Sequence, residues 1–314
     1  MFFTILVPYK TQTMKHLVFT FFFLVLATAL NAQLAIKNSK RLPDVKKGTT
    51  YVVMQNPKSK QSQNFIAVFK KYWTFSAIDF ITEDEMPAHY DATSSFLTLT
   101  ESNNSYVANN TRTDYVEGHF ELWMCEPGFL KKKDGSPSNK QRDVIVSVVM
   151  YFHNTGEGKK PSYKLIDLYE AADHDYSQAP YWTPGLVANY IQRMTTAMGE
   201  GKDMPYGLRV TKTDELSKLK NDTLFIPEWV TDGDKYLFDG YPYHYEILGQ
   251  EELSYKILNS NKPFYYILYK TGLGMRAINI INSKTGDYIY TRYPQMLGGL
   301  GKNEVKELTK SIGK

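Results

Sequence analysis

Two stretches of this chain are variants of one pattern, and together they decide the fold that we expect. The first reads Tyr72-Trp-Thr-Phe-Ser-Ala-Ile-Asp-Phe-Ile-Thr-Glu-Asp-Glu-Met86, and the second reads Tyr241-Pro-Tyr-His-Tyr-Glu-Ile-Leu-Gly-Gln-Glu-Glu-Leu253. Each is an aromatic cluster, then a short apolar run typical of a β-strand, then an acidic segment typical of a helix start. The repeat predicts an internal duplication with two related units. Aligned on Met86 and Leu253, the matching pairs are Asp79 with Glu246, Phe80 with Ile247, Ile81 with Leu248, Asp84 with Glu251 and Glu85 with Glu252.

Outward from the repeat, each unit reads as strand, helix, strand, helix, strand and a terminal β-hairpin. Right-handed crossovers make the first strands parallel, and the hairpin adds antiparallel strands. We therefore expect an α/β (α+β) fold of two tandem related units, each a mixed β-sheet with covering helices and a terminal β-hairpin. The expected boundaries are a polar tether at 33–48, a first unit at 49–180 with an insertion at 101–142, a helical connection at 181–221 and a second unit at 222–314.

Local signals place several elements within these units. Thr183 and Pro184 precede an apolar stripe at i, i+3 and i+4 spacing, which predicts a capped helix from Pro184 to Met198. Gly286 lies in the turn of the second hairpin, at a position that needs positive φ. Further expected elements are the strands 276–281 and 287–292 of that hairpin, the strands 143–152 and 163–169 of the first hairpin, and a short helix at 235–238.

The N-terminus has the features of a secretory signal peptide. Met14-Lys15-His16 is followed by an apolar run from Leu17 to Leu30 and then by Asn31-Ala32-Gln33. This is a short basic region, an apolar core and a small residue at the cleavage point, and the run is too short to span a bilayer comfortably. We expect a signal peptide at 1–32, a true start at Met14 and no transmembrane helix after cleavage. The mature protein is expected to be exported to the periplasm or outside the cell.

The charge of the chain argues against a nucleic-acid partner, and its cysteine content rules out an internal disulfide. Removal of 1–32 takes away Lys10 and Lys15 and no acidic residue, so the net charge falls from +4 to +2. A balance so close to zero argues against nucleic acid as a partner, because a nucleic-acid binder presents a basic stripe. Cys125 is the single cysteine, which rules out an internal disulfide, and its apolar strand predicts a buried thiol.

Candidate chemical groups in the sequence are few. No histidine pair has the spacing of a metal motif, and no phosphate-binding or serine-nucleophile motif occurs, so no cofactor is expected. The run Asp173-His174-Asp175 is the alternative site for a metal or for acid–base chemistry. His119 and Glu121 would share a face of one strand, and Cys125 would share it too, although six residues of extended chain separate it from His119.

The acidic pairs of the repeat have a structural explanation. Asp84 with Glu85, and Glu251 with Glu252, are expected in the first turn of a helix, where carboxylates interact favourably with the helix dipole. Thr82 and Glu85 also have the spacing of a capping box. We therefore do not assign these carboxylates to catalysis.

The segments Lys71-Tyr-Trp-Thr-Phe75, Asp79-Phe-Ile-Thr82 and Ile280-Ile-Asn-Ser-Lys-Thr-Gly-Asp-Tyr-Ile-Tyr290 resemble a set of uncharacterised exported proteins of Bacteroidota. The similarity covers most of the mature chain and includes the end of the signal sequence. It implies an exported protein and a bacterial envelope, and it implies no activity and no site residue. A fainter likeness to the α/β periplasmic domains of envelope-assembly proteins concerns the fold alone.

The expected function is that of an exported, envelope-associated binding or interaction protein without catalytic activity. Its partner would be an envelope protein or a small ligand, held in the cleft between the two units, since ligand pockets favour domain interfaces. The alternative is an envelope hydrolase or metal-dependent enzyme that uses Asp173, His174 and Asp175. The aromatic residues expected to contribute to binding are Tyr181, Trp182, Tyr241, Tyr243 and Tyr245.

Overall fold

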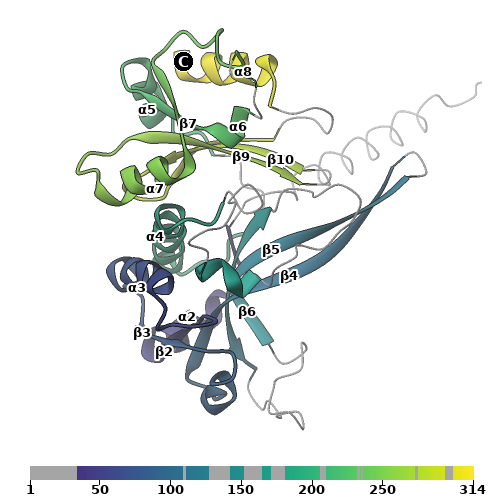
Figure 1. Ribbon diagram of the computed structural model, residues 1–314, viewed down its shortest axis with the longest axis vertical. Coiled ribbons are helices and arrows are strands. Elements are labelled where there is room, and N and C mark those ends of the chain that lie inside the picture. The colour runs from purple at the N-terminus through teal and green to yellow at the C-terminus, as the bar shows by residue number, and fades with distance from the viewer. Residues whose placement is uncertain are drawn as a thin grey trace, which may run out of the picture.

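The protein contains two mixed β-sheets with helices between and around them (Figure 1). The computed structural model describes residues 34–108, 111–126, 142–151, 165–170, 181–205, 210–231, 234, 236–272, 275–293 and 300–314. The expected α/β fold is confirmed by this mixture of helices and mixed sheets. Within the described residues, none of the helices combines the length and the apolar character needed to cross a membrane. The expected signal peptide at 1–32 lies outside the described residues and stays a prediction.

The first sheet has the strand order β1-β6-β5-β4-β2-β3. Next to its edge, β2 pairs in parallel with the edge strand β3 on one side and with β4 on the other, while β4, β5, β6 and β1 follow in antiparallel pairs. Short helical segments and α3 connect these strands. The bounds are β1 Leu34–Ile36, η1 Ser39–Arg41, α2 Leu42–Lys47, β2 Thr49–Val53, α3 Lys60–Tyr72, β3 Ala77–Ile81, η2 Met86–His89, β4 Ser94–Ala108, β5 Thr111–Cys125, β6 Arg142–Tyr151 and η4 Leu165–Tyr169.

The second sheet has the order β11-β10-β9-β7-β8. Here β7 pairs in parallel with β8 and with β9, and β9, β10 and β11 form an antiparallel meander. The order β8-β7-β9-β10-β11 therefore repeats the order β3-β2-β4-β5-β6 of the first sheet, with the same directions. The bounds are α4 Pro184–Glu200, α5 Thr213–Leu216, η6 Ser217–Lys220, β7 Leu224–Pro227, α6 Glu228–Thr231, β8 Tyr245–Leu248, α7 Gln250–Asn259, β9 Tyr265–Gly272, β10 Met275–Asn282, β11 Tyr288–Arg292 and α8 Lys302–Gly313.

The two copies of the sequence repeat occupy matching positions in the two sheets. Each copy supplies the edge strand beside the central parallel strand, β3 beside β2 and β8 beside β7. The last four residues of each strand share one burial order: half-buried, exposed, half-buried, buried. In both strands the acidic residue of the repeat is the exposed one and the final aliphatic residue is buried.

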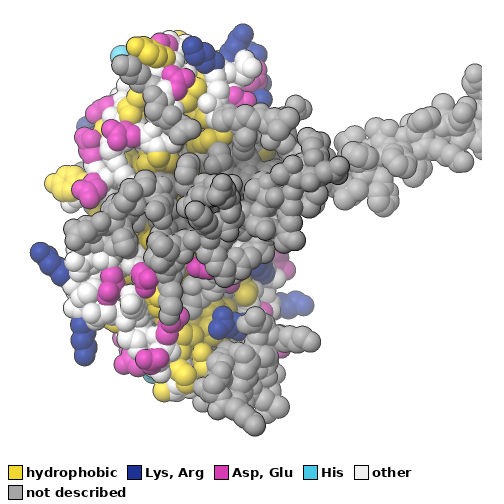
Figure 2. All heavy atoms as spheres, turned by 45° about the vertical axis from the view of Figure 1, so that its right-hand side comes forward, with side chains coloured by type: hydrophobic (Ala, Val, Ile, Leu, Met, Phe, Trp, Pro, Cys, Tyr) yellow, Lys and Arg dark blue, Asp and Glu magenta, His cyan; other side chains and the backbone are white. Residues whose placement is uncertain are grey.

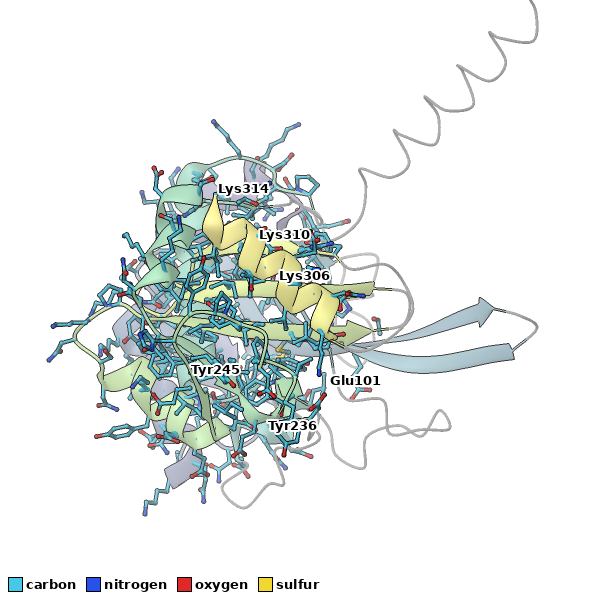
Figure 3. The ribbon with its side chains drawn as sticks, turned by 90° about the horizontal axis from the view of Figure 1, so that it is seen from above. Glu101, Tyr236, Tyr245, Lys306, Lys310 and Lys314 are labelled. Atoms are coloured by element: carbon cyan, nitrogen blue, oxygen red, sulfur yellow. The ribbon has the colours of Figure 1, made fainter. Side chains whose placement is uncertain are left out.

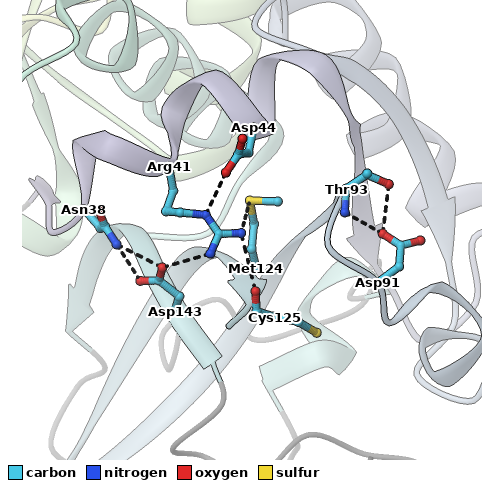
Figure 4. A network of polar contacts seen from close by, with 8 residues as sticks. All are labelled: Asn38, Arg41, Asp44, Asp91, Thr93, Met124, Cys125 and Asp143. Atoms are coloured by element: carbon cyan, nitrogen blue, oxygen red, sulfur yellow. Dashed lines mark hydrogen bonds and ion pairs between the residues drawn. The ribbon is translucent and has the colours of Figure 1, made fainter. Parts of the chain in front are cut away.

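The segment expected as a tether is part of the first sheet, so that prediction is wrong. Leu34, Ala35 and Ile36 are buried as β1, which pairs with β6. The next residues are tied to the ends of β5 and β6 (Figure 4): Asn38 Nδ2 donates to the Asp143 carboxylate at 2.9 and 3.0 Å, and Arg41 forms an ion pair with it at 3.4 Å. The lysines that suggested a tether lie on the solvent side of η1 and α2, whereas the short apolar runs between them are buried.

Within the expected insertion at 101–142, the described residues 101–108 and 111–125 belong to strands of the first sheet. β4 and β5 pair continuously from Ser95 with Met124 to Ala108 with Thr111. Among the described residues, β6 pairs with β5 as far as Glu117, and the end of the β4–β5 hairpin projects from the body as a two-stranded ribbon (Figure 3). The polar, Asn-rich composition resembles a loop, but the main-chain pairing between the strands does not depend on apolar side chains.

Two further local predictions differ from the structure. Residues 165–169, expected in a strand, form the 3₁₀ helix η4, in which Leu165, Ile166, Leu168 and Tyr169 are buried. Apolar residues at spacings of one, three and four fit a helical turn better than the alternation of a strand. The expected helix at 235–238 is a turn over its described residues, where the Asp234 carboxylate accepts a hydrogen bond from the Tyr236 N–H at 2.9 Å.

The helix expected from Pro184 to Met198 is confirmed and lies at the centre of the molecule. In α4, Thr183 Oγ1 accepts a hydrogen bond from the Leu186 N–H, Pro184 occupies the first turn, and Gly201 with φ 67° ends the helix. Figure 1 shows α4 between the two sheets, and it packs on both α3 and α7. One apolar core runs through it from β5 and β6 of the first sheet to β9 of the second. The segment expected to connect two units is thus the core that they share.

Candidate functional site: a groove between α3 and α7

A surface groove of about 560 Å³ lies where the two units meet. One wall is a face of α3 from the first unit, the other is a face of α7 from the second unit, and the start of α4 forms the floor. The α3 wall consists of Asn64, Ala67, Val68, Lys71 and Tyr72. The α7 wall consists of Glu251, Ser254, Tyr255, Leu258 and Asn259, and the floor consists of Thr183 and Pro184.

The two walls have the same spacing along the chain. In each helix the lining residues stand at positions i, i+3, i+4, i+7 and i+8, which is one face of an α-helix over two turns. The opposite face of each helix is buried against its sheet, with Phe65, Ile66 and Phe69 in α3 and Leu253 and Ile257 in α7. The amphipathic pattern that docks each helix on its sheet therefore presents the second face to the groove.

The floor is held by a close crossing of α4 over α7. The Gly185 N–H donates to Ser254 Oγ at 2.9 Å, and the Leu186 N–H donates to Thr183 Oγ1 at 3.3 Å. Two N–H groups that the first turn of a helix leaves without intrahelical partners are thereby satisfied by side chains. The acceptors of these bonds are the two hydroxyl oxygens at the bottom of the groove, those of Ser254 and Thr183. The start of α4 therefore offers neither of these N–H groups to an anion.

The groove is apolar at its base and polar along its rim. Val68 is 4% exposed, and Leu258 and Tyr72 are half-buried, whereas Asn64, Lys71, Glu251 and Asn259 are exposed. Tyr255 stands on the rim with 70% of its surface exposed. The Asn259 side chain donates to the Tyr255 carbonyl at 2.8 Å, and Lys71 Nζ lies 5.0 Å from the Tyr72 ring centre. An apolar base with a polar rim is the arrangement of a protein-binding surface.

The two walls differ in charge. The α3 sequence contains Lys60, Lys70 and Lys71 and no acidic residue. The first turn of α7 contains Glu251 and Glu252. The lysine of α7, Lys256, is turned toward the second sheet, with Nζ 4.3 Å from the Phe225 ring centre. Of these residues, Lys71 on the α3 wall and Glu251 on the α7 wall line the groove, so the two walls carry opposite charges.

The expected aromatic residues lie outside the groove. Tyr181 and Trp182 directly precede the floor residue Thr183, but both are buried in the shared core. The Tyr181 hydroxyl donates to the Tyr269 carbonyl at 2.8 Å, and the Trp182 ring packs on Phe65 and Phe120. They therefore support the floor from below and do not line it.

Tyr241, Tyr243 and Tyr245 pack together beside the second sheet. The ring centres of Tyr241 and Tyr243 are 5.5 Å apart, and those of Tyr241 and Tyr245 are 6.2 Å apart. Phe238 completes this cluster, and burial raises the pKa of the Tyr241 hydroxyl. The expected cleft between the units corresponds to the position of the groove, but the expected side chains do not. The sequence signal that marks the groove is Tyr255, a large aromatic residue on the face of α7 opposite Leu253 and Ile257.

The metal alternative falls outside the described residues, because Asp173, His174 and Asp175 lie in the segment 171–180. Within the ranges that the structure describes, no three or more His, Cys, Asp or Glu side chains come together as metal ligands. The acidic pairs of the repeat differ from each other. Glu251 and Glu252 are in the first turn of α7 as expected, whereas Glu85 precedes η2. There its carboxylate accepts from the Thr82 N–H at 2.8 Å, and this hydrogen bond lowers the Glu85 pKa.

His119 and Glu121 share a face of β5, but they belong to a polar cluster without Cys125. His119 Nε2 lies 2.9 Å from Ser102 Oγ, and the Ser147 hydroxyl donates to Glu121 at 3.1 Å. Cys125 is buried in a separate apolar cluster with Trp123. The expected buried thiol is confirmed, and the structure does not assemble a Cys-His-Glu arrangement.

The remaining charges are mixed in sign. On the face in Figure 2, basic and acidic side chains occur together on both halves of the molecule.

No protein-family model, curated protein or solved structure matches this chain.

Proposed function

We propose that the protein is an exported, envelope-associated binding protein that holds its partner in the groove between α3 and α7. One observation carries this proposal: the groove is built jointly by both units, with one wall from each and a floor from the helix that they share. A site made in this way depends on the two-unit architecture as a whole. Concave sites between units are where ligands bind most often.

Binding without catalysis is favoured by the groups that line the groove. Its lining offers amides, one lysine, one glutamate, tyrosines and aliphatic side chains. The hydroxyls of Thr183 and Ser254 accept hydrogen bonds from α4 and hold its first turn in place. Such a surface suits recognition of an envelope protein or a small ligand. Export to the periplasm or beyond is proposed from the N-terminal sequence, and an origin by duplication is supported by the matching strand orders of the two sheets.

Site-specific photocrosslinking in the native envelope tests the proposal. A benzophenone amino acid replaces Tyr255 on the groove rim or, as a matched control, Tyr236, which is also well exposed at 58% and does not line the groove. We expect a defined adduct from position 255 and none from position 236, and the intact mass of the adduct separates a small ligand from a protein. The substitution Ala67→Arg, on an exposed lining position, should abolish the adduct.

Equal adducts from both positions, or an adduct at 255 that Ala67→Arg does not reduce, would contradict a site in the groove. Circular dichroism and the urea midpoint of each variant confirm that the fold is retained. Ala67 is exposed on α3, so its replacement leaves the core intact.

A further inference from the structure

We infer that the groove recognises an amphipathic α-helix of about two turns, with acidic side chains on its flank toward α3 and basic side chains on its flank toward α7. This inference rests on the proposed function and names the class of partner. Its starting point is the equal spacing of the two walls, each an i, i+3, i+4, i+7, i+8 face. Eight residue steps at 1.5 Å make the groove about 12 Å long, which is the length of two helical turns.

The base of the groove selects an apolar stripe. Val68 of α3, Leu258 of α7 and Pro184 of α4 present carbon surface from three elements. A helix with apolar residues at i, i+3, i+4 and i+7 would place that stripe on this base and its polar residues at the rim. Tyr255 is well exposed on the rim, where an amphipathic ring can cover such a helix from one side.

Two other classes of occupant fit the groove less well. An extended strand needs a main-chain edge to pair with, and both walls are helices whose interior main-chain groups are bonded within the helix. A saccharide needs several hydrogen-bonding groups at the base, whereas the base has mainly carbon surface and the Thr183 and Ser254 hydroxyls, each of which already accepts one N–H of α4. A helix makes no such demand, because its own main chain is satisfied internally.

The charges of the walls set the polarity of the partner. Lys71 lines the α3 side, and Lys60 and Lys70 belong to the same acid-free helix. Glu251 lines the α7 side, beside Glu252. A helix with one acidic and one basic flank would meet opposite charge on both sides in one orientation and like charge in the reverse orientation. Charge complementarity of this kind contributes specificity and orientation.

The groove is ready for such a partner without rearrangement of its floor. Gly185 is in such close contact with α7 that an added Cβ would stand 2.6 Å from the Ser254 carbonyl oxygen. The middle of α4 is bonded to the β10–β11 turn, where Asn189 Nδ2 donates to the Ser283 carbonyl at 2.8 Å. Because α4 is attached to the second unit at both places and packs on α3, the distance between the walls is defined by the fold.

Selection from a display library of randomised helical peptides tests the inference. The probe is a library with variable positions along a helix of three to four turns, selected on the folded mature protein. We expect enriched sequences with apolar residues at i, i+3 or i+4 and i+7, acids on one flank and bases on the other. Fluorescence anisotropy of one enriched peptide should show its affinity lowered more than tenfold by Ala67→Arg.

Adjacent charge reversals provide matched controls on each wall. Lys71→Glu should weaken the enriched peptide by about two- to fivefold, as expected for rim ion pairs, and Lys70→Glu, one residue away and outside the lining, should not. Glu251→Lys should weaken it similarly, and Glu252→Lys should not. Equal effects of each adjacent pair would overturn the polarity assigned to the partner.

Two outcomes would overturn the helical partner. One is enrichment of sequences without helical periodicity, and the other is peptide binding that Ala67→Arg leaves unchanged. If no peptide is enriched while position 255 still gives its groove-dependent crosslink, the helical partner is wrong and the proposed binding function stands. If that crosslink is also missing, the proposed function itself fails.

Discussion

At the scale of single residues, the contact between Gly286 and Asn189 shows why one turn admits only glycine. Gly286 has φ 71°, and a Cβ there would lie 2.2 Å from the Asn189 carbonyl oxygen of α4. Asn189 is buried and bonded on both ends of its amide, since its Oδ1 accepts from the Tyr266 hydroxyl at 2.9 Å. The turn signal in the sequence predicts the positive φ at Gly286. The approach of α4 is a tertiary contact that no local pattern reveals.

Gly286→Ala should lower the free energy of unfolding by about 3 kcal/mol. Of this, about 1–2 kcal/mol comes from the left-handed conformation and the rest from overpacking against α4. Gly201→Ala is the matched control, because Gly201 has φ 67° and nothing within 4 Å of the added Cβ. It should cost about 1 kcal/mol. Urea unfolding measures both, and equal losses would show that the turn does not press on α4.

At the scale of elements, α4 links the two units, because it packs on α3 of the first unit and crosses the second unit at two places. Its first turn crosses α7 at Gly185, and its middle meets the β10–β11 turn, where Arg193 and Asp287 form an ion pair at 3.0 Å. The sequence predicts the helix, its cap and its apolar stripe from local spacing. It does not predict which elements the stripe joins, because an apolar stripe does not identify the surfaces that it packs on. Nor does it predict the close contact at Gly185, because the role of a glycine in a helix is ambiguous until the neighbouring helix is known. The groove exists because α4 packs on α3 and crosses α7, which places these two helices on either side of it.

Two glycines of α4 should respond in opposite directions to alanine. Gly185→Ala should destabilise the protein by about 2 kcal/mol, because the Cβ would overlap the Ser254 main chain. Gly199→Ala has open space around the Cβ and should stabilise the helix by up to about 1 kcal/mol. The difference in free energy of unfolding between the two variants measures the crossing. Stabilisation by both would mean that α4 and α7 are not in close contact.

At the scale of the whole molecule, a tyrosine-rich core joins the two sheets and makes folding sensitive to alkaline pH. Tyr169, Tyr266 and Tyr288 all belong to this core. Burial raises the pKa of each of their hydroxyls above the ordinary value. In the unfolded chain these groups ionise near pH 10, whereas in the folded protein they keep their protons at that pH. The unfolded state then binds fewer protons than the folded state. The free energy of unfolding therefore keeps its full value below about pH 10 and falls as the pH rises above it.

The free energy of unfolding should fall by about 1.4 kcal/mol per pH unit for each of these tyrosines above about pH 10. Urea titrations between pH 8 and pH 11, followed by tryptophan fluorescence, would show the slope. Tyr169→Phe is the control, since its hydroxyl has no hydrogen-bond partner among the residues that the structure describes. This variant should change stability little at pH 8 and should have a shallower decline above pH 10. A slope that is flat, or the same in both proteins, would contradict the role of the buried hydroxyls.

The sequence by itself determined the features that depend on neighbouring residues. These are the α/β class, the strand in each copy of the repeat, the cap of α4, the positive φ at Gly286 and the buried Cys125. Each follows from a spacing or a residue type that acts over a few positions. The tertiary structure alone decided the place of β1, the length of the β4–β5 hairpin, the role of α4 as a shared core and the groove. These depend on contacts between segments far apart in the chain, and a short apolar run such as Leu34–Ile36 cannot reveal which strand it pairs with. Of the aromatic residues that stood out in the sequence, Tyr181, Trp182 and Tyr241 are buried and Tyr243 and Tyr245 are half-buried, because the way the helices dock decides which faces remain exposed.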